Sequence, residues 1–164
     1  MIDLKRILVS TDFSETSRAA LRYGMELADR FHARLYLFHV PPNPGEAAEA
    51  EYPIGIFEIM QNDAHDRLLH LLTDDEARNL RPECAMRVGK PAEEIVKYAT
   101  EHEIDLIVLG THGRRGVARL VLGSVAEQVV RTAPCPVLTV HHPEHEFVVE
   151  DEPIGVSTNY QVAQ

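Results

Sequence analysis

The sequence predicts a single α/β domain built on a parallel β-sheet with helices on both faces. Short apolar runs that end in turn residues alternate with longer stretches whose apolar residues recur at helical spacing. Parallel strands that neighbour one another need crossover connections, and the intervening helices supply them. The length of 164 residues, 45% of them hydrophobic, suits one core of ordinary size.

Five short apolar segments are expected to form the strands. They span residues 6–10, 33–40, 84–88, 105–109 and 136–141. Pro134 and Pro136 flank the last segment. Because proline lacks a backbone N–H, this strand is expected at an edge of the sheet.

Four helices are expected to connect these strands. The first follows Asp12–Glu15, and the last begins at Ser124–Glu127; both segments have the spacing of a capping box. Residues 56–80 are expected to form one long helix, with Met60 among its inward-facing residues. Pro91 suits the first turn of the remaining helix.

Charge is distributed unevenly along the chain. The net charge is −10, from 26 acids against 16 lysines and arginines, which disfavours general binding to nucleic acids or anionic membranes. Residues 141–164 hold five acids and no lysine or arginine, and helical or strand periodicity is lost there. We therefore expect a domain at 1–141 and an acidic tail at 142–164, which is either flexible or docked on a partner. The absence of a signal peptide, a bilayer-spanning stretch and a disulfide framework predicts a cytoplasmic protein.

The segments that leave the first and fourth strands form the candidate ligand site. Ligands of open α/β sheets bind beyond the carboxyl ends of the strands, where the strand order reverses. The fourth strand is followed by Gly110-x2-Gly113 and, after nine more residues, by Gly123-Ser124 at a helix start. Glycines let backbone N–H groups approach an anion, and a helix N-terminus adds further donors. Residues 106–126 hold three arginines and no acid, so the pattern predicts a phosphate site.

Each of these features also has a purely structural interpretation. Ser124 could serve only to close its helix, and Asp12 could serve only to cap the first helix. The glycines could serve only as turns. The two kinds of role are compatible, because a capping hydroxyl can also face a ligand.

The spacing Gly110-x2-Gly113-x9-Gly123-Ser124 resembles the nucleotide motif G-x2-G-x9-G-S/T of the universal stress protein family. The segments Ile7–Ser14, Val88–Pro91 and Ala133–Leu138 extend the resemblance over residues 1–141. The resemblance implies a five-stranded parallel open sheet of order 3-2-1-4-5, of the adenine nucleotide alpha hydrolase-like type. It also implies homodimers that pair across the fifth strand, Pro136–His141.

The resemblance further implies an adenine nucleotide at this site, with ATP as the expected ligand and Mg²⁺ on its phosphates. Asp12 and Val40 would hold the nucleoside end, and the glycine-rich segments would line the ribose and phosphates. No protein ligand for a metal is evident. The candidate nucleotide-binding residues are Ser10, Thr11, Asp12, His39, Val40, Leu109, Gly110, His112, Gly113, Arg114, Arg115, Gly123, Ser124 and Val125.

The sequence leaves three functions open. The first is an ATP-binding regulatory module of the stress response, which acts as a homodimer on an unidentified protein partner. The second is a slow ATPase or phosphotransferase, in which Arg114 or Arg115 would face the γ-phosphate and His112 would assist the attacking water. The third is a dimeric interaction module that binds no nucleotide. Because a Walker A motif is absent, we expect binding with at most slow hydrolysis, and no catalytic residue is assigned.

Overall fold

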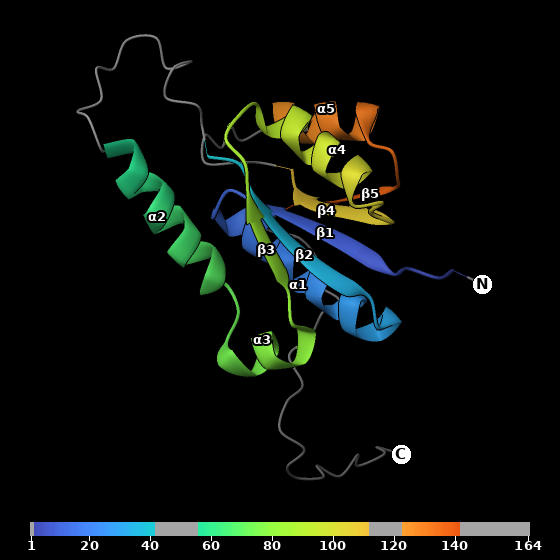
Figure 1. Cartoon of the computed structure of the whole chain (residues 1–164). Helices are drawn as coiled ribbons and strands as arrows, with labels where there is room; N and C mark the ends of the chain where they lie inside the picture. Colours follow the sequence, from blue (N-terminus) through green and yellow to red (C-terminus); the bar gives the residue numbers. More distant parts are fainter. Residues whose placement is uncertain (1, 42–55, 112–122, 142–164) are drawn as a thin grey trace, which may run out of the picture.

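Five parallel strands form one sheet with helices on both faces (Figure 1). The computed structural model describes residues 2–41, 56–111 and 123–141. The strand order is β3-β2-β1-β4-β5, which confirms the predicted fold class and the edge position of the fifth strand. The strands are β1 (Arg6–Thr11), β2 (Arg34–His39), β3 (Glu83–Met86), β4 (Leu106–Gly110) and β5 (Val137–Val140). The helices are α1 (Glu15–Phe31), α2 (Ile56–Leu69), α3 (Asp74–Leu80), α4 (Pro91–Glu101) and α5 (Ser124–Thr132).

Alternate residues of the central strands belong to two separate cores. Ile7 and Val9 of β1 pack with residues of α1 and α2, whereas Leu8 between them packs with residues of α4 and α5. Successive side chains of a strand point to opposite faces, so a strand that is covered on both faces must be apolar throughout. All three side chains are 0% exposed. Side chains therefore fill both faces at the centre of the sheet, which leaves the ends of the strands for ligand binding.

Two glycines allow α1 to pack directly on the sheet. A Cβ placed on Gly24 would lie 2.2 Å from Cγ2 of Val9 in β1. A Cβ placed on Gly110, at the end of β4, would lie 2.9 Å from the backbone carbonyl carbon of Thr16 in the first turn of α1. Both distances are too short for a real side chain. The two close approaches hold α1 against β1 and β4 and place its first turn at the carboxyl edge of the sheet.

Residues 56–80 form two helices, so the prediction of one long helix is wrong. The chain leaves α2 at Leu69 and begins α3 after Thr73. The Thr73 hydroxyl accepts a hydrogen bond from the N–H of Glu76 at 3.4 Å, and the Glu76 carboxylate accepts one from the N–H of Thr73 at 2.7 Å. This capping box starts a new helix by satisfying donors that a continuous helix would not leave free. Met60 was predicted to face inward and is 47% exposed, because the buried residues described in α2 lie further along the helix.

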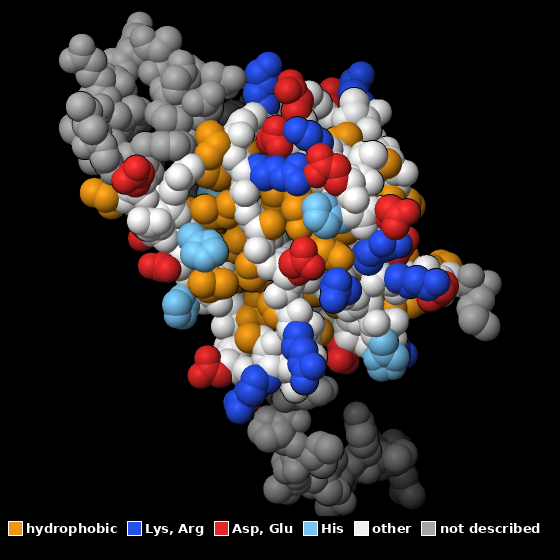
Figure 2. Space-filling view, viewed as in Figure 1, with side chains coloured by type: hydrophobic (Ala, Val, Ile, Leu, Met, Phe, Trp, Pro, Cys, Tyr) orange, Lys and Arg blue, Asp and Glu red, His pale blue; other side chains and the backbone are white. Residues whose placement is uncertain are grey.

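The β3 edge of the sheet is less covered than its centre. Figure 2 shows apolar side chains gathered in the middle of this face, with charged side chains mostly around them. Cys84, Ala85 and Met86 of β3 are each partly buried. Burial raises the pKa of Cys84 and of Cys135, so both side chains stay as thiols at neutral pH.

No helix of the described ranges is long and apolar enough to span a membrane.

The phenol of Tyr98 lies in the core between the sheet and α4 and gives the protein a predicted alkaline transition. The ring is 3% exposed and stacks on the ring of His102 at a centroid distance of 3.8 Å. Burial raises the pKa of Tyr98 to about 12 from a usual value of 10.0. The pKa of this phenol is therefore higher in the folded protein than in the unfolded chain. Burial of the neutral phenol stabilises the fold at pH values below the unfolded pKa, and this stabilisation is lost as the pH rises toward 12.

We therefore expect Tyr98→Phe to flatten the decline in the free energy of unfolding across this alkaline range. Urea denaturation of both proteins at a series of pH values measures it. An equally steep decline in the variant would contradict the assignment to Tyr98.

Candidate functional site

The carboxyl ends of β1 and β4 lie side by side in the middle of the sheet (Figure 1). Ser10 of β1 is in register with Leu109 of β4, and Thr11 is in register with His39 of β2. The chain leaves β1 for β2 on one side, while β4 lies on the other side, so the strand order reverses here. Open α/β sheets bind ligands at such a switch point. The structure therefore brings together the segments that sequence analysis selected.

A chain of hydrogen bonds attaches the start of α5 to this edge. The N–H of Gly123 donates to the carbonyl oxygen of Thr111 at 2.6 Å. The N–H of Thr111 donates to the carbonyl oxygen of Val140 at 2.8 Å, and its hydroxyl lies 3.1 Å from Nδ1 of His141. Thr111 thus joins β4, β5 and α5. Sequence analysis missed this residue, because an isolated threonine after a glycine carries no recognisable signal.

Among the described residues, no side chain caps the first turn of α5. Gly123 occupies the N-cap position, and Ser124 is already the first helical residue, with an exposed side chain. The Glu127 carboxylate accepts a hydrogen bond from Arg131 at 2.8 Å. The capping-box interpretation of Ser124 and Glu127 is therefore wrong, since the serine stands one position too late. The N–H groups of the first turn have no acceptor within the helix, so this helix end can receive an anion.

The turn after β1 is held by short-range hydrogen bonds. The Asp12 carboxylate accepts the N–H of Ser14 at 3.0 Å, and the Thr11 hydroxyl accepts the N–H of Phe13 at 3.0 Å. Ser14 Oγ accepts the N–H of Ser17 at 3.2 Å, so Ser14 caps α1 and the alternative interpretation of Asp12 as the cap is wrong. Phe13 has φ 64°, a left-handed conformation that is uncommon for a bulky residue. Asp12 therefore shapes the turn that leads from the strand to the helix.

His39 and Val40 are positioned at the β2 side of the same edge, and both are mostly enclosed by protein. His39 is 7% exposed, and its Nδ1 lies 2.7 Å from the carbonyl oxygen of Thr11. Its ring centroid lies 4.5 Å from that of Phe13. Val40 is 8% exposed and belongs to the core beneath α4 and α5. These two residues support this end of the sheet, and His39 is held there by its contact with Thr11.

Four of the candidates lie outside the described residues: His112, Gly113, Arg114 and Arg115. Gly110 lies at the site, but the space where its side chain would be is filled by α1, so glycine is required there for packing. Within the described ranges, no three histidine, cysteine, aspartate or glutamate side chains form a group that could hold a metal ion.

These features define an open, doubly wound α/β domain whose switch point lies between β1 and β4. The model of the universal stress protein family matches residues 3–141, and the chain belongs to this family. Universal stress protein MJ0531 of Methanocaldococcus jannaschii is 36% identical over 145 residues, which cover 87% of this chain and 85% of that protein.

Solved structures share the fold. The structure of MJ0577, a universal stress protein of the same organism, has a TM-score of 0.70 and 27% sequence identity, and covers 88% of this chain and 100% of its own. A universal stress protein solved in complex with cAMP has a TM-score of 0.55 and 28% identity, and covers 85% of this chain and 98% of its own.

Proposed function

We propose that this protein is a regulatory module that binds an adenine nucleotide, with ATP and Mg²⁺ as the ligand. The observation that carries the proposal is the uncapped first turn of α5, attached through Gly123 and Thr111 to the end of β4. Its free N–H groups and the exposed hydroxyl of Ser124 are suitable donors for phosphate oxygens. Asp12, at the end of the neighbouring strand, is the candidate for the nucleoside end.

The family relationship supports an adenine nucleotide as the ligand class. A relative 28% identical to this chain was solved with cAMP, which contains adenine, ribose and phosphate. The described residues offer donors for phosphate and no group of metal ligands. A bound Mg²⁺ would supply charge neutralisation on the phosphates, and the protein would hold it through them.

We further propose that the protein acts as a homodimer in the cytoplasm and passes nucleotide occupancy to a protein partner. The position of β5 at the edge of the sheet supports the dimer, because an edge strand has a row of unpaired backbone groups. The exposed side chains of Val125 and Val130 on the adjacent α5 add apolar surface.

The decisive experiment is mass spectrometry of what the purified protein releases on denaturation, followed by calorimetric titration with ATP in the presence of Mg²⁺. ATP or ADP in the supernatant, or saturable binding by the nucleotide-free protein, is the expected result. A protein that is empty as purified and gives no heat of binding would overturn the proposal.

A substitution at Ser124 tests the proposed phosphate contact. Ser124→Ala is expected to weaken ATP binding about tenfold or more, because a hydrogen bond to a charged phosphate contributes about 1.5–3 kcal/mol. Ser124→Thr keeps the hydroxyl and is expected to bind like the original protein. The fold should be unaffected in both variants, because Ser124 is exposed and caps no helix. Equal affinities of the alanine and threonine variants would exclude a role for the hydroxyl.

A further inference from the structure

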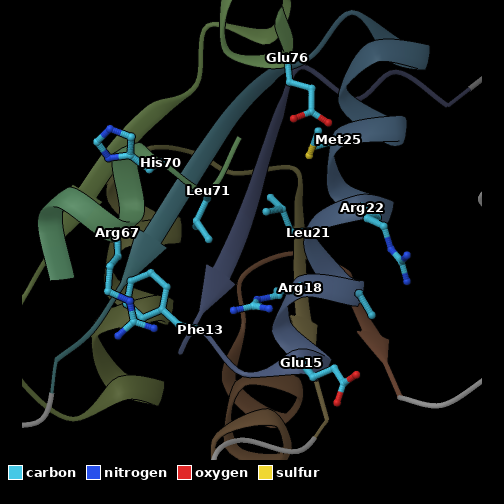
Figure 3. A pocket seen from close by; sticks show the side chains of 11 residues that line it. Phe13, Glu15, Arg18, Leu21, Arg22, Met25, Arg67, His70, Leu71 and Glu76 are labelled. Carbon is cyan, nitrogen blue, oxygen red and sulfur yellow. The ribbon is translucent and has the colours of Figure 1, made fainter. Parts of the chain in front are cut away.

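A groove is lined by residues of α1, of α2 and of the segment that leads into α3 (Figure 3). Its volume of about 710 Å³ is in the range of ligand pockets. The floor is apolar and is formed by Phe13, Leu21, Met25 and Leu71. Phe13 and Leu21 are buried, whereas Met25 and Leu71 are partly exposed. The groove can therefore accept apolar side chains.

Three arginines line this groove in a protein whose net charge is −10. The guanidinium carbon of Arg67 lies 4.2 Å from the centroid of the Phe13 ring, and its ion pair with Asp63 is 4.0 Å long, so this pairing is weak. In Figure 3, Arg18 extends from α1 toward the region where Arg67 covers Phe13. Arg22 also belongs to the lining.

The lining of the groove holds three arginines and two glutamates. Of the two glutamates, Glu76 is already bonded to the backbone N–H and the hydroxyl of Thr73. Among the described residues, no ion pair involves the Arg18 side chain. The groove therefore combines an apolar floor with a surplus of positive charge, which suits an acidic segment that contains apolar residues.

The chain itself contains such a segment. Residues 144–152 read Glu-His-Glu-Phe-Val-Val-Glu-Asp-Glu, with three apolar residues between acids and with no lysine or arginine. Alternate residues of an extended segment face the same side, so Phe147 and Val149 can enter the groove together. The five acids then flank the apolar residues on both sides.

The segment also begins near the groove. His141 contacts Thr111, which follows Gly110, and a Cβ on Gly110 would lie 2.9 Å from the backbone of Thr16. Arg18 is two residues beyond Thr16, about half a turn of helix, so its exposed side chain lies on the other side of α1 from the buried Thr16. Extended chain covers about 3.4 Å for each residue, so residues 142–147 span up to about 20 Å, more than the diameter of a helix of about 10–12 Å.

We propose that residues 144–152 dock in the α1–α2 groove of the same molecule. Phe147 and Val149 contact the apolar floor, and the flanking acids pair with Arg18 and Arg67. This contact requires no nucleotide and goes beyond the proposed function. It assigns a role to the acidic tail and covers the apolar floor of the groove.

Paramagnetic broadening in the full-length chain tests this proposal. A nitroxide is attached at Pro153→Cys, in a protein whose two native cysteines are replaced by alanine. We expect strong broadening of the amide signals of Leu21 and Leu71. Arg18→Glu should reduce this broadening at least twofold, and Phe147→Asp should do the same. Arg30→Glu is the matched control, because Arg30 is an exposed residue in the last turn of α1 and does not line the groove.

Three results would overturn the proposal. The first is the absence of broadening at the groove, and the second is an equal effect of the Arg18 and Arg30 substitutions. The third comes from a mixture of isotope-labelled protein without a nitroxide and unlabelled protein that carries the nitroxide. If the groove signals are broadened only in this mixture, the tail docks in a neighbouring molecule. ATP titration of the same sample is a separate measurement, so failure of tail docking is distinguishable from failure of nucleotide binding.

Discussion

Gly24→Ala is expected to lower the free energy of unfolding by about 2 kcal/mol, although alanine favours a helix more than glycine does. The added Cβ would lie 2.2 Å from Cγ2 of Val9, a fully buried side chain of β1. Valine is branched at Cβ and has little freedom to rotate away. Overpacking of this kind costs up to about 3 kcal/mol, of which the gain in helix propensity offsets about 1 kcal/mol.

A double-mutant cycle separates this clash from a general effect on α1. Val9→Ala removes the methyl group that the new Cβ meets and by itself destabilises the protein. In the Val9→Ala protein, Gly24→Ala is expected to be neutral or stabilising by up to about 1 kcal/mol. Urea denaturation of the four proteins gives the coupling energy. If the effects of the two substitutions are additive, the contact between the added Cβ and Val9 is not the cause of the destabilisation.

Asp12→Asn is expected to weaken ATP binding about 10-fold to 100-fold and to leave stability within about 0.5 kcal/mol of the original protein. The asparagine amide oxygen can still accept the N–H of Ser14, which Asp12 accepts at 3.0 Å, so the turn after β1 is kept. What is lost is the carboxylate charge, and a hydrogen bond to a charged group contributes about 1.5–3 kcal/mol.

Asp12→Ala is the companion variant, because it removes both the charge and the turn bond. It should lose ATP affinity to at least the same extent and should also be less stable. Calorimetric titration and urea denaturation measure the two quantities. An Asp12→Asn protein that binds ATP as tightly as the original would reduce Asp12 to a turn residue.

Much of the fold was predictable because the sheet imposes a simple pattern. Central strands covered on both faces must be continuous apolar runs, and such runs stand out in a sequence. The start of α3 was not predictable from apolar spacing, because spacing alone cannot show where one helix ends and another begins. Thr73 and Glu76 do carry the capping-box signal, and attention to it would have divided the long helix.

The site was predicted less completely, because hydrogen-bond partners depend on one-residue differences in position. Ser14 and Asp12 both suit an N-cap, and only the coordinates distinguish them. Gly110 was attributed to anion binding, whereas its observed neighbour is the backbone of Thr16 on another element. Such contacts between distant segments are invisible in a single sequence. The ligand roles of the glycine-rich segment stay predictions.

The hydrogen bond between His39 and Thr11 determines which ring nitrogen of His39 carries a hydrogen at this end of the sheet. A carbonyl oxygen can only accept, so the 2.7 Å contact requires that Nδ1 of His39 carries a hydrogen. The ends of β1 and β2 are therefore tied together by a buried side chain whose Nδ1 hydrogen has a fixed position.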